Sequence, residues 1–338
     1  MPFINDILKY NSLSIVGLEK NTGKTECLKY VLDRLPVQTK RIAVTSIGID
    51  GETVDQVTRT QKPEIVLREG MCFGTSEMHY RQRRLVSELI DVSDESTSLG
   101  RVVTARALTG GKILLSGPSS GSSLKRWMGR MDQFGIDLVI IDGALSRLSS
   151  ASPAVSQSMI LATGAAYSAN ISTLVSKTAH VVDLVNLNLT TEANLRLLSP
   201  LEQGVWFIDS DGVLHDLDML SSLSQDIRFE GMENCATLYV AGALVDSFLE
   251  KVRQNKHLRQ AEIVVRDFTK IFVTPQQFKL FLKAGGRISV LQKSKLIAVT
   301  VNPTSPSGYV LDSDTLCGKL TEAIGLPVYD LLKSKTCN

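Results

Sequence analysis

The feature that most constrains this chain is a glycine-rich segment that follows a short apolar run and precedes a stretch with helical periodicity. The segment reads Gly17-Leu18-Glu19-Lys20-Asn21-Thr22-Gly23-Lys24-Thr25, after the apolar run Leu13-Ser14-Ile15-Val16. Beyond it, apolar residues recur at helical spacing at Cys27, Leu28, Val31, Leu32 and Leu35, and Pro36 closes the segment. The sequence therefore predicts a strand, a tight loop and a helix in direct succession.

The residue types in this loop are those that bind phosphate. A loop between a strand and a helix directs backbone N–H groups at one anion, and the positive end of the helix dipole adds attraction. The lysine then reaches the terminal phosphates of a nucleotide, and the threonine hydroxyl holds Mg²⁺. We therefore expect a nucleotide-binding loop formed by Gly17, Lys20, Asn21, Thr22, Gly23, Lys24 and Thr25. A glycine-rich turn with an incidental surface lysine is the alternative, and Lys20 either faces the phosphates or points to solvent.

Carboxylates near the loop would complete such a site. Four consecutive apolar residues precede Asp142, which predicts a strand buried on both faces with a carboxylate at its C-terminal end. Ligands of open α/β sheets bind at that end, so Asp142 is expected to be catalytic and to hold Mg²⁺ directly or through water. Asp50, with Glu52, follows the predicted strand Arg41–Gly48 and is expected to orient water or to complete the metal shell. Both Asp-Gly pairs also fit ordinary turns.

Strands and helices alternate along the chain, which predicts an α/β fold with a mostly parallel sheet of the P-loop NTPase type. Within it, Glu77–Asp91 is expected to be helical, and Arg101–Leu108 with Lys112–Ser116 is expected to form a hairpin across Thr109-Gly110-Gly111. A change of composition near Leu198–Gly204 predicts a domain boundary. We therefore expect a nucleotide-binding domain at residues 1–200 and a second, smaller α/β domain at residues 201–338 that makes partner contacts.

Composition narrows the possible partners. The 338 residues carry a formal net charge of only +2, so the chain lacks the strong positive electrostatic field that favours nucleic acid as a partner. No apolar run approaches about 18 residues, so no membrane segment is expected. The five cysteines lack metal-ligand spacing, which favours reduced thiols in the cytoplasm. The guanine-reading tetrapeptide Asn-Lys-x-Asp is absent from the sequence, which favours ATP over GTP.

The loop resembles known families. Five residues separate Gly17 and Gly23 where the common GxxxxGK[ST] pattern has four, as in the dethiobiotin synthetase pattern Gly-Thr-Asp-Thr-x-x-Gly-Lys-Thr. Lys20–Thr25 is also similar to the loop of the molybdopterin-guanine dinucleotide accessory GTPases. The series Gly17–Thr25, Thr45–Glu52, Ile141–Ala144, Leu161–Ala165, Asn302-Pro303 and Pro327–Asp330 resembles one subunit of the lysine 5,6-aminomutase reactivating factor of amino-acid-fermenting bacteria.

The last resemblance implies an ATP-dependent accessory protein in lysine fermentation. Its partners would be a MutS-like ATPase subunit and an adenosylcobalamin-dependent aminomutase, from which a nucleotide-driven conformational change releases damaged cofactor. The chain has no Asp-x-His-x-x-Gly cobalamin motif, which fits a factor that handles the holoenzyme.

Two alternatives remain. The first is an ATP-dependent ligase similar to dethiobiotin synthetase, which needs a substrate lysine after the second strand. This chain has Thr45, Ser46 and Asp50 there. The second is a nucleotide-responsive interaction module with negligible turnover.

Overall fold

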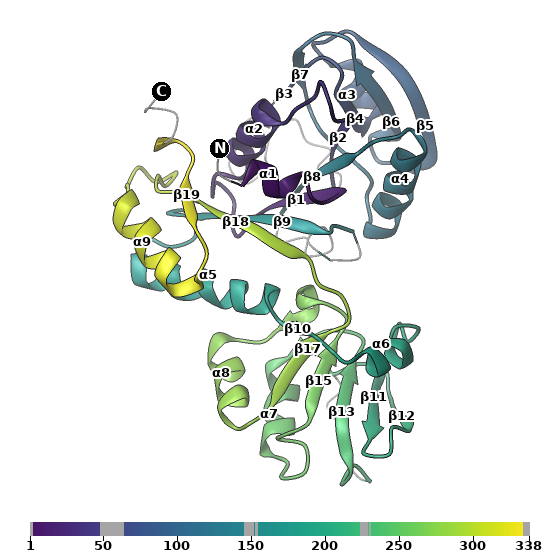
Figure 1. Ribbon diagram of the computed structural model, residues 1–338, viewed down its shortest axis with the longest axis vertical. Coiled ribbons are helices and arrows are strands. Elements are labelled where there is room, and N and C mark those ends of the chain that lie inside the picture. Colours follow the sequence, from purple (N-terminus) through teal and green to yellow (C-terminus); the bar gives the residue numbers. More distant parts are fainter. Residues whose placement is uncertain are drawn as a thin grey trace. The chain divides into compact units, whose positions relative to one another are not determined.

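The chain has two compact α/β units. The computed structural model describes residues 3–47, 64–144, 152, 155–223, 229 and 231–333. Unit 1 consists of Met1–Thr178 and Ser294–Asn338, and unit 2 consists of Ala179–Lys293 (Figure 1). Within these residues, no helix combines the length and the apolar character needed to cross a membrane.

Unit 1 is built on a large mixed sheet that is mostly parallel. Its parallel strands, from one edge inward, are β19 (Val328–Asp330), β18 (Lys295–Asn302), β9 (Ser158–Gly164), β1 (Ser12–Gly17), β8 (Leu138–Ala144), β2 (Ile42–Ser46) and β4 (Cys72–Ser76). Neighbours in this series are all parallel. Two antiparallel strands, β6 (Gly100–Ala107) and β5 (Ser87–Thr97), extend it beyond β4.

Helices cover both faces of this sheet. The helices of unit 1 are α1 (Ile4–Ile7), α2 (Lys24–Arg34), α3 (Glu77–Arg81), α4 (Gly121–Gln133), the first part of α5 (Ile171–Val185) and α9 (Ser313–Ile324). Residues of β8 alternate between the faces: Leu138 and Ile140 pack in the cluster that contains α2, whereas Val139 and Ile141 pack with α4. Strands buried on both faces explain the continuous apolar runs that the sequence shows.

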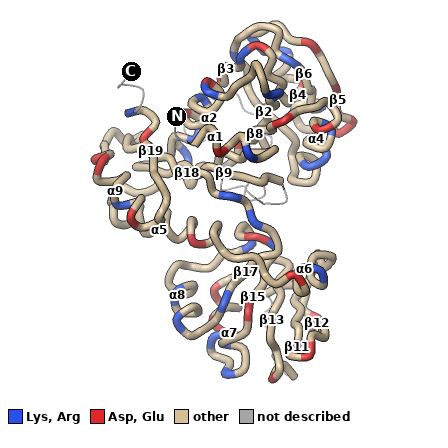
Figure 2. Tube along the Cα trace, in the orientation of Figure 1, with Lys and Arg blue, Asp and Glu red and all other residues tan. Residues whose placement is uncertain are grey.

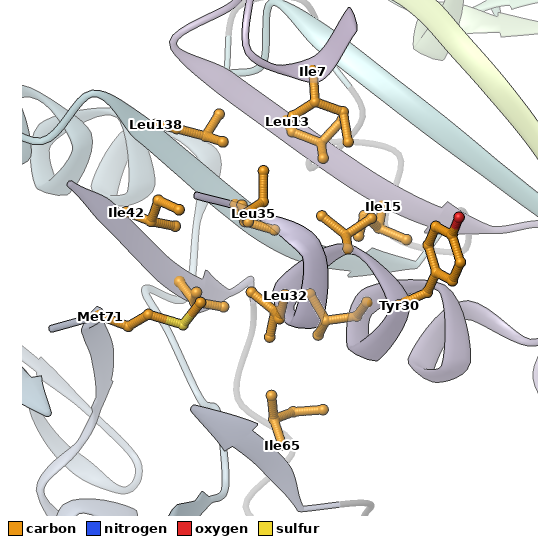
Figure 3. Packing of buried hydrophobic residues seen from close by; sticks show 14 of the residues in the cluster. Ile7, Leu13, Ile15, Tyr30, Leu32, Leu35, Ile42, Ile65, Met71 and Leu138 are labelled. Carbon is orange, nitrogen blue, oxygen red and sulfur yellow. The ribbon is translucent and has the colours of Figure 1, made fainter. Parts of the chain in front are cut away.

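Helix α2 fixes the loop that precedes it by burying its apolar stripe on the sheet. Leu28 and Leu32 are at most 1% exposed, and Figure 3 shows Leu32 and Leu35 among side chains of the central strands, including Leu13 and Ile42. Because burial of a leucine side chain contributes roughly 1.5–3 kcal/mol, this stripe anchors the start of α2 firmly against β1. The predicted strand, loop and helix are therefore present at their expected positions.

Two local predictions are wrong, and pairing between strands is the reason. The helix expected at Glu77–Asp91 ends at Arg81, and Ser87–Thr97 instead forms β5, which pairs with β6. The expected hairpin partner of β6 also differs. β7 (Gly111–Ile113) pairs with β3 (Ile65–Leu67) in a separate two-stranded sheet. In both cases tertiary pairing overrode the local pattern.

Unit 2 has a smaller mixed sheet of its own. Its strands follow the order β10 (Asn188–Leu189), β17 (Arg287–Val290), β15 (Glu262–Val265), β13 (Cys235–Val240), β11 (Val205–Asp209) and β12 (Leu214–Met219). The pairing is parallel from β10 to β13 and antiparallel beyond it, where β11 and β12 form a hairpin. A further two-stranded sheet joins β14 (Leu244–Val245) and β16 (Ile271–Phe272), and the 3₁₀ helix Phe268–Lys270 precedes β16.

Helices cover both faces of the smaller sheet. Figure 1 shows α7 (Asp246–Gln254) and α8 (Pro275–Lys283) on one side of it and α6 (Glu192–Leu198) on the other. Leu198 of α6 packs with Tyr239 and Val264 from the sheet. Phe248 of α7 and Phe281 of α8 are completely buried. Unit 2 thus has its own core.

The units do not follow the boundary that composition predicts near residue 200. The chain enters unit 2 within α5, after Thr178, and leaves it after Lys293. β18 then returns to the large sheet, where it pairs with β9, and β19 pairs with β18. Unit 2 is therefore inserted in the sequence of unit 1. The strand that follows it, β18, pairs with β9, which lies more than 100 residues earlier in the sequence.

One edge strand of each sheet carries several acidic residues. β5, at the end of the large sheet, contains Glu88, Asp91, Asp94 and Glu95. β12, at one end of the smaller sheet, contains Asp216 and Asp218. Figure 2 colours the acidic residues of the chain red. Charged side chains on an edge strand oppose pairing with the edge of another chain, so these residues oppose association through β5 and β12.

Glycine at position 117 is required by close packing on β2. A Cβ atom there would lie 1.7 Å from the backbone oxygen of Ser46. We expect Gly117→Ala to lower the free energy of unfolding by about 1–3 kcal/mol, the usual cost of overpacking, in a chemical denaturation experiment. The matched control is Gly129→Ala in α4, where nothing lies within 4 Å of the added atom. Its expected effect is a gain of about 0.5–1 kcal/mol. Equal stabilities of the two variants would contradict the packing argument.

Candidate functional site

The Gly17–Thr25 loop leaves the sheet at the centre of its carboxyl edge. Gly17, the last residue of β1, is paired with Ala144 of β8 on one side and Ala162 of β9 on the other. Leu18 continues this arrangement, because its N–H donates to the backbone oxygen of Ala162 at 2.9 Å. Parallel strands direct their carboxyl ends to one edge, which is where ligands of such sheets bind.

The loop is folded tightly, and its glycines are needed for this. Gly23 has φ 87° and forms the N-cap of α2, where its oxygen accepts the Cys27 N–H at 2.9 Å. At Gly17, an added Cβ would lie 2.8 Å from Oγ1 of Thr22. That hydroxyl donates to the backbone oxygen of Glu19 at 2.8 Å and so closes the loop on itself. This compact turn into a helix N-terminus is the geometry that anion-binding loops use.

The structure brings two of the predicted residues into contact. Nζ of Lys24, the first residue of α2, lies 2.8 Å from Oδ1 of Asp142 on β8. The contact is an ion pair without good hydrogen-bond alignment. The Lys24 and Asp142 side chains are 26% and 20% exposed, so the pair is accessible from solvent but partly shielded by the protein. Burial of this degree strengthens the attraction relative to a surface pair.

The pair has a clear chemical capacity. A lysine ammonium at a helix N-terminus can leave a carboxylate for the oxygens of a polyphosphate, which carry more charge. The released carboxylate can then hold a hydrated Mg²⁺, which prefers oxygen ligands and keeps several waters. On binding of a magnesium–nucleotide complex, Lys24 could therefore leave Asp142 for the phosphate oxygens, and Asp142 could hold the hydrated Mg²⁺.

The other predicted residues are placed less fully. Thr25 is the second residue of α2 and is half-buried, Lys20 is exposed, and Asp50 lies outside the described residues. No group of three or more His, Cys, Asp or Glu residues that could hold a metal ion occurs in the described part of the chain. Among the described residues, Thr25 and Asp142 have oxygens that could hold Mg²⁺ beside those of a phosphate.

Sequence reasoning missed one residue of the site, Asn302. It is the last residue of β18, and its side-chain Nδ2 donates to the backbone oxygen of Asn21 at 3.0 Å. The sequence pattern predicts this strand in a separate C-terminal domain, so it gives Asn302 no contact with the loop. Asn302 appears only as part of the motif series that resembles the reactivating factor. A polar residue at the carboxyl end of a buried strand was the available signal.

Cys27 lies beneath the loop in the first turns of α2. The side chain is completely buried, and burial raises the pKa of its thiol to about 12, although a hydrogen bond with Thr300 opposes the shift. The nearby Asp142 carboxylate also raises this pKa. Cys27 is therefore a neutral packing residue rather than a nucleophile.

The last two residues of β2, Thr45 and Ser46, hold neighbouring backbone. Oγ1 of Thr45 donates to the backbone oxygen of Gly74 at 3.0 Å, and Oγ of Ser46 accepts the N–H of Gly117 at 3.3 Å. These bonds position the segment that leads to α4, whose N-cap is Ser120. Both hydroxyls thus have a structural use at the carboxyl edge of the sheet.

Comparisons with models of protein families, with curated proteins and with solved structures found no match to this chain.

Replacement of Asp142 tests the exchange between the ion pair and a bound nucleotide. We expect Asp142→Asn to weaken the magnesium dependence of ATP binding and to tighten binding of magnesium-free ATP by up to about fivefold, because Lys24 no longer has to leave a carboxylate. Calorimetric titrations with and without Mg²⁺ measure both effects. The matched control is Asp137→Asn, which removes a carboxylate just before β8 at the opposite end of the strand. Identical magnesium titrations for Asp142→Asn and the parent protein would remove Asp142 from the site.

Proposed function

We propose that this chain is a P-loop protein of the dethiobiotin synthetase-like branch that binds ATP with Mg²⁺ and uses it as a switch. The contact between Lys24 and Asp142 at the Gly17–Thr25 loop carries the proposal. The loop supplies the backbone for phosphate, Lys24 the charge for the terminal phosphates, and Thr25 with Asp142 the oxygens for Mg²⁺. Lys20, Asn21 and Thr22 contribute to the loop, and Asp50 has an assigned catalytic role that rests on sequence alone.

ATP hydrolysis fits this arrangement better than the ATP-dependent activation of a small substrate by a ligase. Phosphoryl transfer needs positioning and charge stabilisation, and a lysine, a metal and a carboxylate that orients water supply both. The last two residues of β2, Thr45 and Ser46, hold neighbouring backbone through their hydroxyls. The ligase reading would need a substrate lysine in that stretch, where the sequence has none between Thr45 and Thr60. We therefore favour a slow ATPase over an ATP-dependent ligase.

The client of the switch is proposed from the order of motifs along the chain. Together with a MutS-like ATPase subunit, the protein would help to reactivate an adenosylcobalamin-dependent aminomutase of the lysine 5,6-aminomutase type in the cytoplasm. A nucleotide can shift a client between two states only if the protein binds those states with different affinity. ATP binding to unit 1 would supply this difference, and unit 2 would contribute partner contacts.

Lys24→Ala tests nucleotide binding directly. The ammonium makes charge-assisted interactions with phosphate worth roughly 1.5–3 kcal/mol, so we expect ATP affinity to fall at least tenfold and hydrolysis to be lost. The fold should persist, because Lys24 stands at the start of α2 with a partly exposed side chain. Lys29→Ala is the matched control, since Lys29 lies on the same helix and pairs with Glu26. Unchanged ATP affinity in Lys24→Ala would refute the assignment.

A reconstitution assay tests the client. An aminomutase inactivated during turnover is incubated with this protein, the MutS-like subunit, adenosylcobalamin and MgATP, and recovered activity is measured. We expect recovery with ATP and little with ADP, and faster ATP hydrolysis in the presence of the aminomutase. ATP binding without any hydrolysis would favour the nucleotide-responsive interaction module, and ATP-dependent modification of a small carboxylate or amine would favour the ligase.

A further inference from the structure

Asn302 is held in one orientation by three hydrogen bonds at the end of β18. Its backbone oxygen accepts the N–H of Ala165 at 2.9 Å, and its side-chain Oδ1 accepts the N–H of Thr304 at 3.1 Å. Because a backbone N–H can only donate, this second bond identifies the oxygen of the side-chain amide. Nδ2 must then face the backbone oxygen of Asn21, to which it donates at 3.0 Å.

Asn302 also contacts the loop at a second point. A Cβ atom added to Gly23 would lie 3.0 Å from the Cβ of Asn302, so the two backbones approach closely there. Asn302 therefore touches both Asn21 and Gly23, which have left-handed φ angles of 62° and 87°. Glycine adopts this conformation freely, and asparagine adopts it more readily than most other residues. The bond from Asn302 helps to hold Asn21 in it.

The bond to Asn21 also sets the direction of the next N–H group. A trans peptide is planar, and its C=O and N–H point in opposite directions. With the Asn21 oxygen held by Asn302, the N–H of Thr22 must point away from Asn302. Rotation of this peptide by half a turn would replace that N–H by a carbonyl oxygen, which repels phosphate.

We propose that Asn302 is a positioning residue for the phosphate-binding loop, which it keeps competent by fixing the peptide between Asn21 and Thr22. This inference rests on the proposed nucleotide binding and deepens it. The ligand recognised through Asn302 is the phosphate chain, irrespective of the base attached to it. Asn302 reaches the loop from a strand that follows the whole of unit 2 in sequence, so a complete phosphate site requires the C-terminal segment of the chain.

The test compares binding of ATP, ADP and inorganic pyrophosphate to the parent protein, Asn302→Ala and Asn302→Leu by calorimetry. Leucine keeps about the volume of asparagine but cannot donate. We expect both variants to bind all three ligands about fivefold more weakly, the effect of one lost hydrogen bond. The matched control is Tyr309→Phe, which removes the bond from the Tyr309 hydroxyl to the oxygen of Ala165 without touching the loop. This variant should bind like the parent, and thermal unfolding without ligand identifies any variant that is misfolded.

The outcomes separate this inference from the function on which it rests. Failure of the parent protein to bind ATP and pyrophosphate would overturn both. Parent-like binding by Asn302→Ala would overturn the role of Asn302 alone. Weaker binding of ATP and ADP with unchanged pyrophosphate binding would assign Asn302 to the base and also overturn the inference. Parent-like binding by Asn302→Leu would also overturn it, because leucine can pack against Gly23 but cannot donate to the Asn21 oxygen.

Discussion

The site depends on the pairing of β1 with two strands that lie far from it in sequence. β8 and β9 flank β1 in parallel, and their registers place Gly17 opposite Ala144 and Ala162. The same register places Asp142 opposite Ile15, two residues before Gly17, so the carboxylate lies close to the start of the loop. A slip of one residue would turn Asp142 to the other face of the sheet and away from Lys24. The ion pair is thus a consequence of strand register.

The order of the sheet explains why Lys24 and Asp142 meet although 117 residues separate them in sequence. Lys24 and Asp142 can each be predicted from a local pattern. Lys24 lies at the end of a glycine-rich loop before an apolar helical stripe, and Asp142 follows the apolar run of a buried strand. Their proximity follows from a general property of parallel sheets, whose carboxyl ends share an edge. The α/β fold class, β1, α2, β8 and the residues of this pair could therefore be predicted from the sequence.

Other parts of the fold could not be predicted, because they depend on pairing with strands that are distant in the sequence and that a local pattern does not identify. The stretch Glu77–Asp91 is expected to be helical from its local pattern, but its last five residues begin β5, and the pairing of β5 with β6 makes them a strand. β18 has the same apolar character as the strands of unit 2, and its pairing with β9 decides that it belongs to unit 1. Asn302 was missed for the same reason, because a residue assigned to a separate domain has no cause to touch the loop.

The insertion of unit 2 has a consequence for the order in which the protein is made. A ribosome releases unit 2 completely before β18 and β19 emerge, and domains generally fold as units during synthesis. Unit 2 has its own core and can become compact at that stage. The sheet of unit 1 must wait, with the outer side of β9 unpaired, until β18 arrives. The nascent chain therefore exposes a strand edge in the middle of its larger sheet until β18 has emerged, and this interval is when the protein is most open to chaperones and to aggregation.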